Sequence, residues 1–526
     1  MIKRALINRS ARLPRALLSL IIITVQLLNT LPGASCLFAQ DLSSLRVNNK
    51  NALTSEAIKQ LDGVLDFIFA NHLAVGSVAI QQNGQILYER TLTPDVSGNG
   101  KIPDKEPDKE NPSFVYTTGS VSKMFTAVMI MQLIEEGKLS LDTKLSKYFS
   151  GLPSADSISI EMLLRHRSGL PDYTIDKIES LNQDSLFATV HYDYGRLHTN
   201  LGWLLDPIKN PEDSILHMLS HSQVHFRPNA SSEYNNSGYW LLAAIIEKCT
   251  GSSFDSNLKR RITDRLGLIH TLTAGRLEKM KHNTPLKIRE SYYYCGGWQK
   301  SADIYLPNVQ GAGDILSTPE DLLAFMQGLY HGKLVSAKTL ALMDDFHYPD
   351  SSHLGQFGLG LESALWPDND LAAGHSGDTY FNHGGVFYFP KTGYAICCLL
   401  NGLSPQFERN DMLDILYHAT QNKTLELPFV DKWHPAIREV TPLLGTYYCD
   451  RLKMTISLLN DGNTVIVYPK GQDALCTYWT APDQINQPKY DLNIHFMRDK
   501  SAFQLTQHGK TYNFVKQVAT KKNQEA

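Results

Sequence analysis

This sequence has few cysteines and a small net charge, and each of these features excludes a class of protein. Seven cysteines among 526 residues are too few for a disulfide-scaffold protein, and they show no CxxC or Cys/His spacing of the kind that structural zinc sites need. Fifty basic and 53 acidic side chains leave a net charge of −3, which supplies no field to attract nucleic acid or an anionic membrane. Any partner is therefore expected to be recognised locally.

Long apolar runs are scarce as well, and the one exception lies near the N-terminus. Five basic residues precede an apolar stretch from Leu17 to Leu31, which falls short of the roughly 20 residues that a spanning helix needs. Small residues follow, which completes the pattern of a secretory signal. We expect residues 1–39 to be a signal peptide and the protein to be exported, periplasmic or extracellular, with no integral membrane span after signal removal. Lipoprotein-type cleavage before Cys36 and an uncleaved anchor are the alternatives.

Apolar residues are abundant enough for a large folded core. They make up 42% of the chain against 20% charged residues, which excludes a largely disordered protein. At about 150 residues per domain the length suggests three or four domains. Helical and strand patterns are mixed up to about residue 420. Expected helices begin after the N-cap Thr54 and span 120–136, 214–219, 238–248 and 319–329, and expected strands span 78–80, 86–88, 385–390 and 394–400.

The pattern changes after about residue 430. Two apolar segments, 454–459 and 464–468, are joined by Asn-Asp-Gly-Asn, and alternating apolar residues follow with no convincing helix. We interpret residues 435–518 as a small antiparallel β domain, a barrel, joined by a short linker to a larger domain of residues 50–425. A leader, one large unit and one small unit then account for the length.

A serine and a lysine stand three residues apart at the start of the helix expected from residue 120. Positions i and i+3 share a helix face, so the Lys123 amine can reach the Ser120 oxygen. Serine is a weak nucleophile unless a base lies beside it, and a helix N-terminus favours developing negative charge. The same SxxK spacing recurs at Ser256 and Lys259, so the pattern alone also fits a capping serine followed by a surface lysine.

Two further groups follow in the chain. Tyr234 and Asn236 form a YxN pattern in a turn before an apolar helix, and His375 and Gly377 form an HxG pattern before a strand pair. Together with SxxK, these groups in this order resemble the serine β-lactamase and penicillin-binding-protein superfamily, in its class C and DD-peptidase-like esterase branch.

The resemblance runs from about residue 55 to 420. Residues 163–173, LLRHRSGLPDY, and residues 311–322, GAGDILSTPEDL, are similar to further segments of that family. The resemblance implies an α+β fold of the β-lactamase/transpeptidase type, in which helices flank an antiparallel sheet and a helical subdomain is added. A small all-β, lipocalin-like domain is expected after it.

The resemblance also implies a mechanism without a metal or organic cofactor. Ser120 attacks a carbonyl to form an acyl-enzyme, and Lys123 and Tyr234 share the role of base. Asn236 holds Lys123 and the substrate. Water then releases the acyl group.

On the strand beside the nucleophile, His375 replaces the lysine of the family's KTG motif. A neutral imidazole is a weaker anchor for an anion than lysine is. The backbone N–H groups of Ser120 and Asp378, the latter directly after Gly377, are expected to form the oxyanion hole.

Several residues compete with these assignments. Lys391-Thr392-Gly393 is literally KTG and residues 380–382 are literally YxN, but Pro390 and Gly393 indicate a turn between two strands. His383 is a rival to His375.

The remaining histidines and cysteines have structural interpretations. The spacing of His217, His221 and His225 could cluster imidazoles on one helix face, yet no further metal ligand is evident. His166 is expected to be structural, as are the buried strand residues Cys397 and Cys398. A pairing of Cys449 with Cys476 is left open.

The sequence therefore predicts a secreted serine hydrolase that acts through an acyl-enzyme. Hydrolysis of D-amino-acid peptides or esters is favoured over efficient β-lactam hydrolysis, because HxG stands in place of KTG. Its partner would be a small-molecule or peptide substrate: a peptidoglycan-like peptide, a β-lactam or an ester. The alternative is a catalytically silent penicillin- or peptidoglycan-binding protein that uses the same cleft. The sequence makes no prediction of the oligomeric state.

Overall fold

The computed structural model describes residues 53–93, 114–174, 206–280, 283–294, 297–301, 304–347, 356–461, 464–470 and 475–517. The expected signal peptide and Cys36 lie outside these residues. Within the described ranges, no helix combines the length and the apolar character needed to cross a bilayer.

An antiparallel sheet forms the centre of the larger domain. Its strand order is β2-β1-β12-β11-β10-β9, and β6 adds to β12 in parallel with β7 beside it. The 78–80 and 86–88 segments pair as the expected hairpin. The strands are β1 (Ala74–Gln82), β2 (Gln85–Leu92), β6 (Ser291–Tyr294), β7 (Trp298–Ser301), β9 (Glu362–Trp366), β10 (Asp370–Asp378), β11 (His383–Phe389) and β12 (Tyr394–Leu403).

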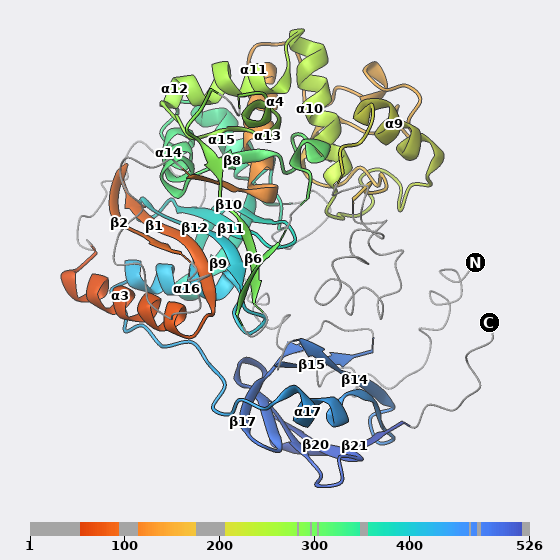
Figure 1. Cartoon of the computed structure of the whole chain (residues 1–526). Coiled ribbons are helices and arrows are strands. Elements are labelled where there is room, and N and C mark those ends of the chain that lie inside the picture. Colours follow the sequence, from red (N-terminus) through yellow and green to blue (C-terminus); the bar gives the residue numbers. More distant parts are fainter. Residues whose placement is uncertain are drawn as a thin grey trace.

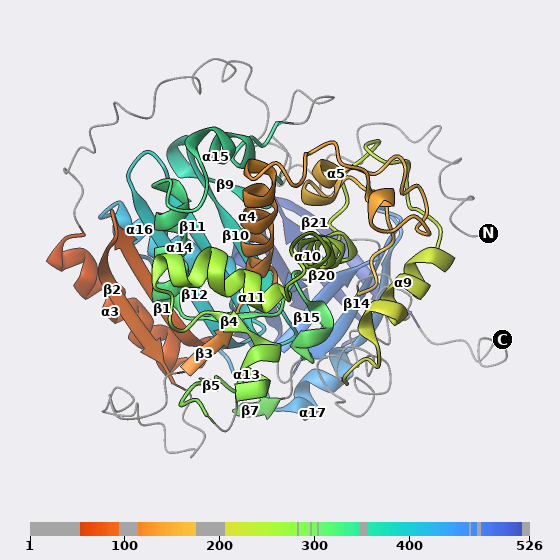
Figure 2. The same cartoon turned by 90° about the horizontal axis from the view of Figure 1, so that it is seen from above.

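Helices cover both faces of this sheet (Figures 1 and 2). One face packs against α3 (Ser55–Ala70), which Thr54 caps by accepting from Ala57 N, and against α16 (Arg409–Thr420). The other face packs against α14 (Pro319–Tyr330) and the helices around it. Each face of the sheet has its own hydrophobic core. Adjacent residues of β12 point into different cores: Cys398 into the first core, beneath α3 and α16, and Cys397 into the second core, beneath α14. The expected α+β architecture is confirmed.

The remaining elements of the larger domain are further helices and a small second sheet. A small sheet has the order β4-β8-β3-β5. The elements are α5 (Ile160–Leu164), α9 (Pro211–His221), α10 (Asn236–Thr250), α11 (Phe254–Leu258), α12 (Asp264–Leu266), α13 (Ala274–Met280), α15 (Ala337–Met343), β3 (Phe114–Thr117), β4 (Leu272–Thr273), β5 (Lys287–Ile288) and β8 (Ile315–Ser317).

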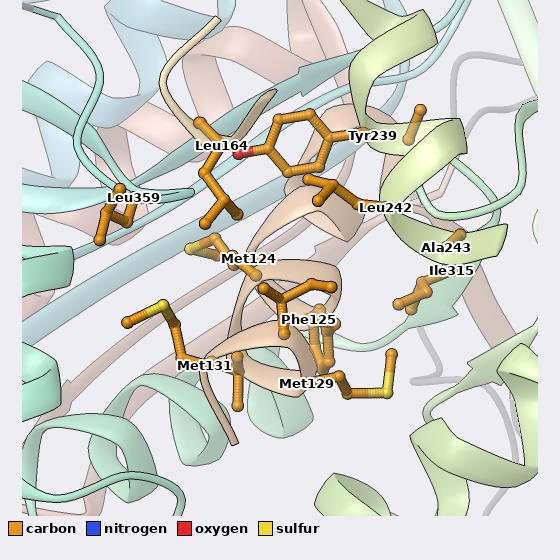
Figure 3. Packing of buried hydrophobic residues seen from close by; sticks show 14 of the residues in the cluster. Met124, Phe125, Met129, Met131, Leu164, Tyr239, Leu242, Ala243, Ile315 and Leu359 are labelled. Carbon is orange, nitrogen blue, oxygen red and sulfur yellow. Dashed lines mark hydrogen bonds between the residues drawn. The ribbon is translucent and has the colours of Figure 1, made fainter. Parts of the chain in front are cut away.

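Helix α4 (Ser122–Glu135) lies in the middle of the second core. Every residue from Ser122 to Leu133 is buried, as expected of a helix that is enclosed on all sides. Figure 3 shows Met124 and Phe125 packed with Tyr239 and Leu242 of α10. A helix held this firmly gives the residues at its N-terminus a fixed position.

The C-terminal residues form a separate antiparallel sheet that nearly closes into a barrel. Its order is β16-β15-β14-β13-β21-β20-β19-β18-β17, and the two ends approach each other at β15 and β17. The strands are β13 (Gly445–Cys449), β14 (Met454–Asp461), β15 (Thr464–Pro469), β16 (Leu475–Cys476), β17 (Tyr478–Ala481), β18 (Gln484–Gln487), β19 (Leu492–Phe496), β20 (Ala502–Gln507) and β21 (Lys510–Lys516). The expected β domain is confirmed.

The structure adds two details of this domain: one helix that the sequence did not indicate, and the outcome of a cysteine pairing that the sequence left open. A one-turn helix, α17 (Ile437–Val440), precedes the sheet where no helix was expected, and it is too short to produce a readable period. Cys449 carries a free thiol, so the disulfide with Cys476 is not formed.

The barrel contacts the larger domain just before α16. The Gln406 amide donates to the Thr477 carbonyl at 3.1 Å, and the Tyr478 hydroxyl donates to the Gln406 carbonyl at 2.6 Å. Lys489 pairs with Glu408 and Asp411 at 3.5 and 3.4 Å. These contacts join the barrel to the first turn of α16.

Candidate active site

Ser120 lies in a single 3₁₀ turn (Gly119–Val121) between β3 and α4. Gly119 has a φ of 51°, and a Cβ there would come within 2.9 Å of both the nitrogen and the oxygen of Asp378. Only glycine fits this left-handed position without strain. The turn is thus pressed against the end of β10.

Lys123 is fully buried in the first turn of α4. Its Nζ lies 3.0 Å from Ser120 Oγ, 2.7 Å from Asn236 Oδ1 and 2.9 Å from the carbonyl oxygen of Ala312. Burial lowers the pKa of Lys123 to about 7, against the opposing charges of Asp172 and Glu362. A large share of the amine is therefore neutral near pH 7.

The partners of Lys123 determine where its lone pair lies. Asn236 Oδ1 and the Ala312 carbonyl can only accept hydrogen bonds, so they take the two N–H groups of the neutral amine. The Asn236 amide is held in this orientation because its Nδ2 donates to Thr174 Oγ1 at 2.7 Å. The remaining lone pair then faces the Ser120 hydroxyl, as a general base requires.

Tyr234 is the second group on the nucleophile. Its hydroxyl donates to Ser120 Oγ at 2.6 Å, and Lys123 Nζ lies 4.7 Å from its ring centroid. Burial raises the pKa of the Tyr234 phenol well above its ordinary value. The phenol therefore stays protonated and acts as a hydrogen-bond donor, so the geometry suits Lys123 as the proton acceptor and Tyr234 as the proton donor.

His166 positions the loop that carries Tyr234. It has a φ of 58°, its Nδ1 accepts from Asn235 N at 3.0 Å, and its ring lies 4.5 Å from the Tyr234 ring. Burial lowers the pKa of His166 well below its ordinary value, so the ring is neutral. Asn235 in turn caps α10 by accepting from Gly238 N at 2.7 Å. These contacts agree with the structural role expected for His166.

Asp172 and Thr174 support the site in a way that the sequence interpretation did not assign. Asp172 Oδ1 accepts from both N and Oγ1 of Thr174, at 2.7 and 2.6 Å, and Oδ2 accepts from Asn236 N. Asp172 belongs to the LLRHRSGLPDY segment, whose similarity to the family could have pointed to this residue. Its contacts with Thr174 and Asn236 are evident only in the fold.

The end of β10 forms the opposite wall. A Cβ on Gly377 would overlap the Thr118 carbonyl and come within 3.0 Å of Ser120 N, so the strand and the nucleophile turn touch through their backbones. A cavity of about 730 Å³ opens here, and its lining includes Ser120, Tyr234, Asn236, His375 and Asp378. The structure therefore brings these sequence-predicted site residues to one cavity, and Lys123 contacts Ser120 without being part of the lining.

The competing residues lie elsewhere or have other partners. Lys391 occupies the β11–β12 turn, where its Nζ donates to the Asn369 carbonyl at 2.8 Å. His383 Nδ1 lies 2.8 Å from Asp378 Oδ1. Asn382 donates to Ser291 Oγ at 2.8 Å. Of the literal YxN, Tyr380 alone reaches the cavity lining.

The histidine series does not form a shared site. The rings of His217 and His221 lie 4.1 Å apart on α9, whereas His225 pairs with Glu233. Among the described residues, no group of three or more His, Cys, Asp or Glu side chains is arranged to hold a metal ion.

His375→Ala is expected to reduce kcat/KM at least about tenfold, because it removes a buried group of the cavity wall. Lys391→Ala is expected to change it less than about twofold, since Lys391 is a surface turn residue. Steady-state kinetics on one ester substrate compare the two. The reverse order would show that the wrong strand segment was assigned.

Arg409 holds Asp378 from the first turn of α16, which sequence patterns did not indicate. Its guanidinium pairs with Asp378 Oδ2, while His383 holds Oδ1. Arg409→Gln is expected to lower kcat about tenfold with little change in KM, because the oxyanion donor at Asp378 loses its support. The exposed Arg438→Gln is the control for charge loss. An unchanged kcat in Arg409→Gln would contradict this role.

The chain is similar in sequence and fold to several known proteins. The chain is 27% identical over 332 residues to penicillin-binding protein 4* of Bacillus subtilis, covering 61% of this chain and 66% of that protein. It is 26% identical over 348 residues to the teichoic acid D-alanine hydrolase of Staphylococcus aureus, covering 64% of this chain and 72% of the relative. Among solved structures, D-amino acid amidase from Ochrobactrum anthropi has a TM-score of 0.55 at 24% identity, covering 70% of this chain and 99% of that one.

The family model described as Beta-lactamase matches residues 56–419, which include the turn of Ser120, the loop of Tyr234 and the strand of His375. The chain therefore belongs to the β-lactamase family and is a serine hydrolase of that family.

Proposed function

We propose that this serine hydrolase cleaves D-amino-acid amides or esters through an acyl-enzyme on Ser120. The observation that carries the proposal is the arrangement around Ser120 Oγ, with Lys123 Nζ at 3.0 Å and the Tyr234 hydroxyl at 2.6 Å. The names of relatives support the substrate class, because they include a teichoic acid D-alanine hydrolase and a D-amino acid amidase.

Acylation begins when Ser120 Oγ attacks the substrate carbonyl and its proton passes to Lys123. The developing oxyanion is stabilised by the N–H groups of Ser120 and Asp378, and each such donor contributes about 3 kcal/mol to transition-state stabilisation. The bond to the leaving amine or alkoxide then breaks, and that group takes a proton from Tyr234, which Lys123 replenishes. Water attacks the acyl-enzyme and gives its proton to Lys123, which passes a proton to Ser120 Oγ as the acid leaves.

His375 disfavours the carboxylate-bearing β-lactams. Burial lowers the pKa of His375, against the opposing charge of Glu362, so the imidazole provides no permanent positive charge where the family's lysine would. Efficient β-lactam hydrolysis is therefore not expected.

An activity panel tests the proposal. The protein is assayed with D-alanine p-nitroanilide, p-nitrophenyl acetate, a D-alanyl-D-alanine peptide and nitrocefin, with Ser120→Ala as the blank. We expect D-alanyl anilide turnover to exceed that of nitrocefin. Nitrocefin as the best substrate would overturn the proposal. Acylation without any turnover would favour the silent binding protein.

The expectations for the two ends of the chain stay predictions. Export is supported by the basic, apolar and small-residue segments of residues 1–39. The lipocalin-like assignment of the C-terminal domain is supported by its neighbour-to-neighbour strand order.

A further inference from the structure

Among the described residues, the lining of the cavity beside Ser120 has more acidic than basic side chains. Among the described residues that line it, the charged side chains are Glu362 and Asp378, with no lysine or arginine. The Asp378 carboxylate is paired with Arg409 and His383. Glu362 Oε2 lies 3.7 Å from His375 Nδ1, but burial lowers the pKa of that imidazole, so none of the described lining residues offers Glu362 a permanent cation.

Hydrogen bonds hold the Glu362 side chain in place on β9, the strand that pairs with β10. It lies on β9 opposite Gly374 of β10. Its Oε2 accepts from Ser376 N and Oγ at 2.8 and 2.7 Å, and its Oε1 accepts from Gln356 Nε2 at 3.0 Å. A carboxylate has about four acceptor positions, so these three bonds leave room for one more donor. Its side chain is 13% exposed, and it borders the cavity.

The charge state of Glu362 follows from these bonds. Burial raises the pKa of the carboxyl, but the nearby His375 and the hydrogen bonds from Ser376 and Gln356 lower it below its ordinary value overall. The group is thus ionised at neutral pH. A buried carboxylate of this kind favours a cationic partner.

His375 adds a second acceptor to the same wall. Its Nδ1 lies within hydrogen-bond distance of the Ser376 carbonyl oxygen, which can only accept, so Nδ1 carries the hydrogen. Because the ring is neutral, Nε2 then carries a lone pair. The Glu362 carboxylate and His375 Nε2 are therefore both hydrogen-bond acceptors. They suit a substrate group that donates hydrogen bonds, and neither suits a substrate carboxylate.

We propose that Glu362 binds the ammonium group of the substrate, so that the enzyme selects acyl groups that carry a free amino group, as in unblocked aminoacyl amides and esters. The inference builds on the function proposed above and specifies its substrate class. An N-blocked analogue lacks the cation and leaves Glu362 without a charged partner.

The test compares D-alanine p-nitroanilide with its N-acetyl derivative, and p-nitrophenyl acetate serves as a neutral reference. In the wild type, kcat/KM for the free amine is expected to exceed that of the N-acetyl compound at least about tenfold, as expected for a hydrogen-bonded charge pair. In Glu362→Gln the ratio of the two is expected to fall to near one, mainly through KM for the free amine. Glu212→Gln, which removes a carboxylate paired with Lys248 on the surface, is expected to keep the wild-type ratio.

The outcomes separate the two claims. A wild-type ratio near or below one, or a Glu362→Gln variant with an unchanged ratio, overturns the inference while the proposed function stands. Ser120-dependent cleavage of p-nitrophenyl acetate without cleavage of either D-alanyl compound overturns both. The wild-type ratio needs no variant, so misfolding of Glu362→Gln does not affect that part of the test.

Discussion

Ser120→Ala is expected to reduce turnover of every substrate by at least about 10³-fold, because the variant has no atom that can form the acyl-enzyme. The change removes one partly buried oxygen in the turn before α4, so the fold is expected to persist. Initial rates on p-nitrophenyl acetate and D-alanine p-nitroanilide measure the effect, and circular dichroism checks the fold.

The chain supplies its own control for this variant. Ser256 has the same SxxK spacing, but it lies on the surface of α11, where its hydroxyl accepts from Ser253 Oγ at 2.8 Å. Ser256→Ala is expected to retain wild-type rates. If Ser120→Ala and the wild type hydrolyse the substrates at comparable rates, the nucleophile has been assigned wrongly.

Lys123→Met is expected to lower kcat by about 10²- to 10⁴-fold, the range associated with loss of a general base. Methionine fills similar volume without an amine, so Ser120 keeps its place but loses its proton acceptor. The variant is expected to be at least as stable as the wild type, because burial of a chargeable amine is removed. Lys259→Met, on the surface beside Asp264, is the matched control.

The pH profile of the wild type tests the same residue. Lys123 acts as a base only when it is neutral, and its pKa is about 7. Therefore kcat/KM for p-nitrophenyl acetate, which has no ionisable amine, should rise about tenfold per pH unit below that value and level off above it. A profile that is flat from pH 5 to 9, or a Lys123→Met variant with wild-type kcat, would contradict the role of Lys123.

The sequence was sufficient to predict the site residues that belong to short sequence motifs. Ser120 in the turn before α4 is three residues from Lys123 in its first turn, and Tyr234 is two residues from Asn236 at the start of α10, so each short spacing is kept in the fold. The HxG segment could be distinguished from the literal KTG because Pro390 and Gly393 indicate a turn, and the structure places Lys391 there.

Residues that act through tertiary contacts left no such pattern. Glu362 reaches the cavity because β9 pairs with β10, and Arg409 reaches Asp378 because α16 packs across the sheet. β9 and β10 are consecutive strands, but no short pattern sets Glu362 opposite Gly374, and Arg409 is 31 residues from Asp378. The division of labour between Lys123 and Tyr234 also depends on burial, which moves the two pKa values in opposite directions. The short helix α17 was missed because four residues show no periodicity.

Covalent labelling tests the central claim most directly. The mature protein is treated with a fluorophosphonate probe, and the labelled peptide is identified by mass spectrometry. We predict one adduct on Ser120, absent from Ser120→Ala and present in Ser256→Ala. An adduct on another residue, equal labelling of the wild type and Ser120→Ala, or no labelling of the wild type would contradict the assignment of Ser120 as the nucleophile.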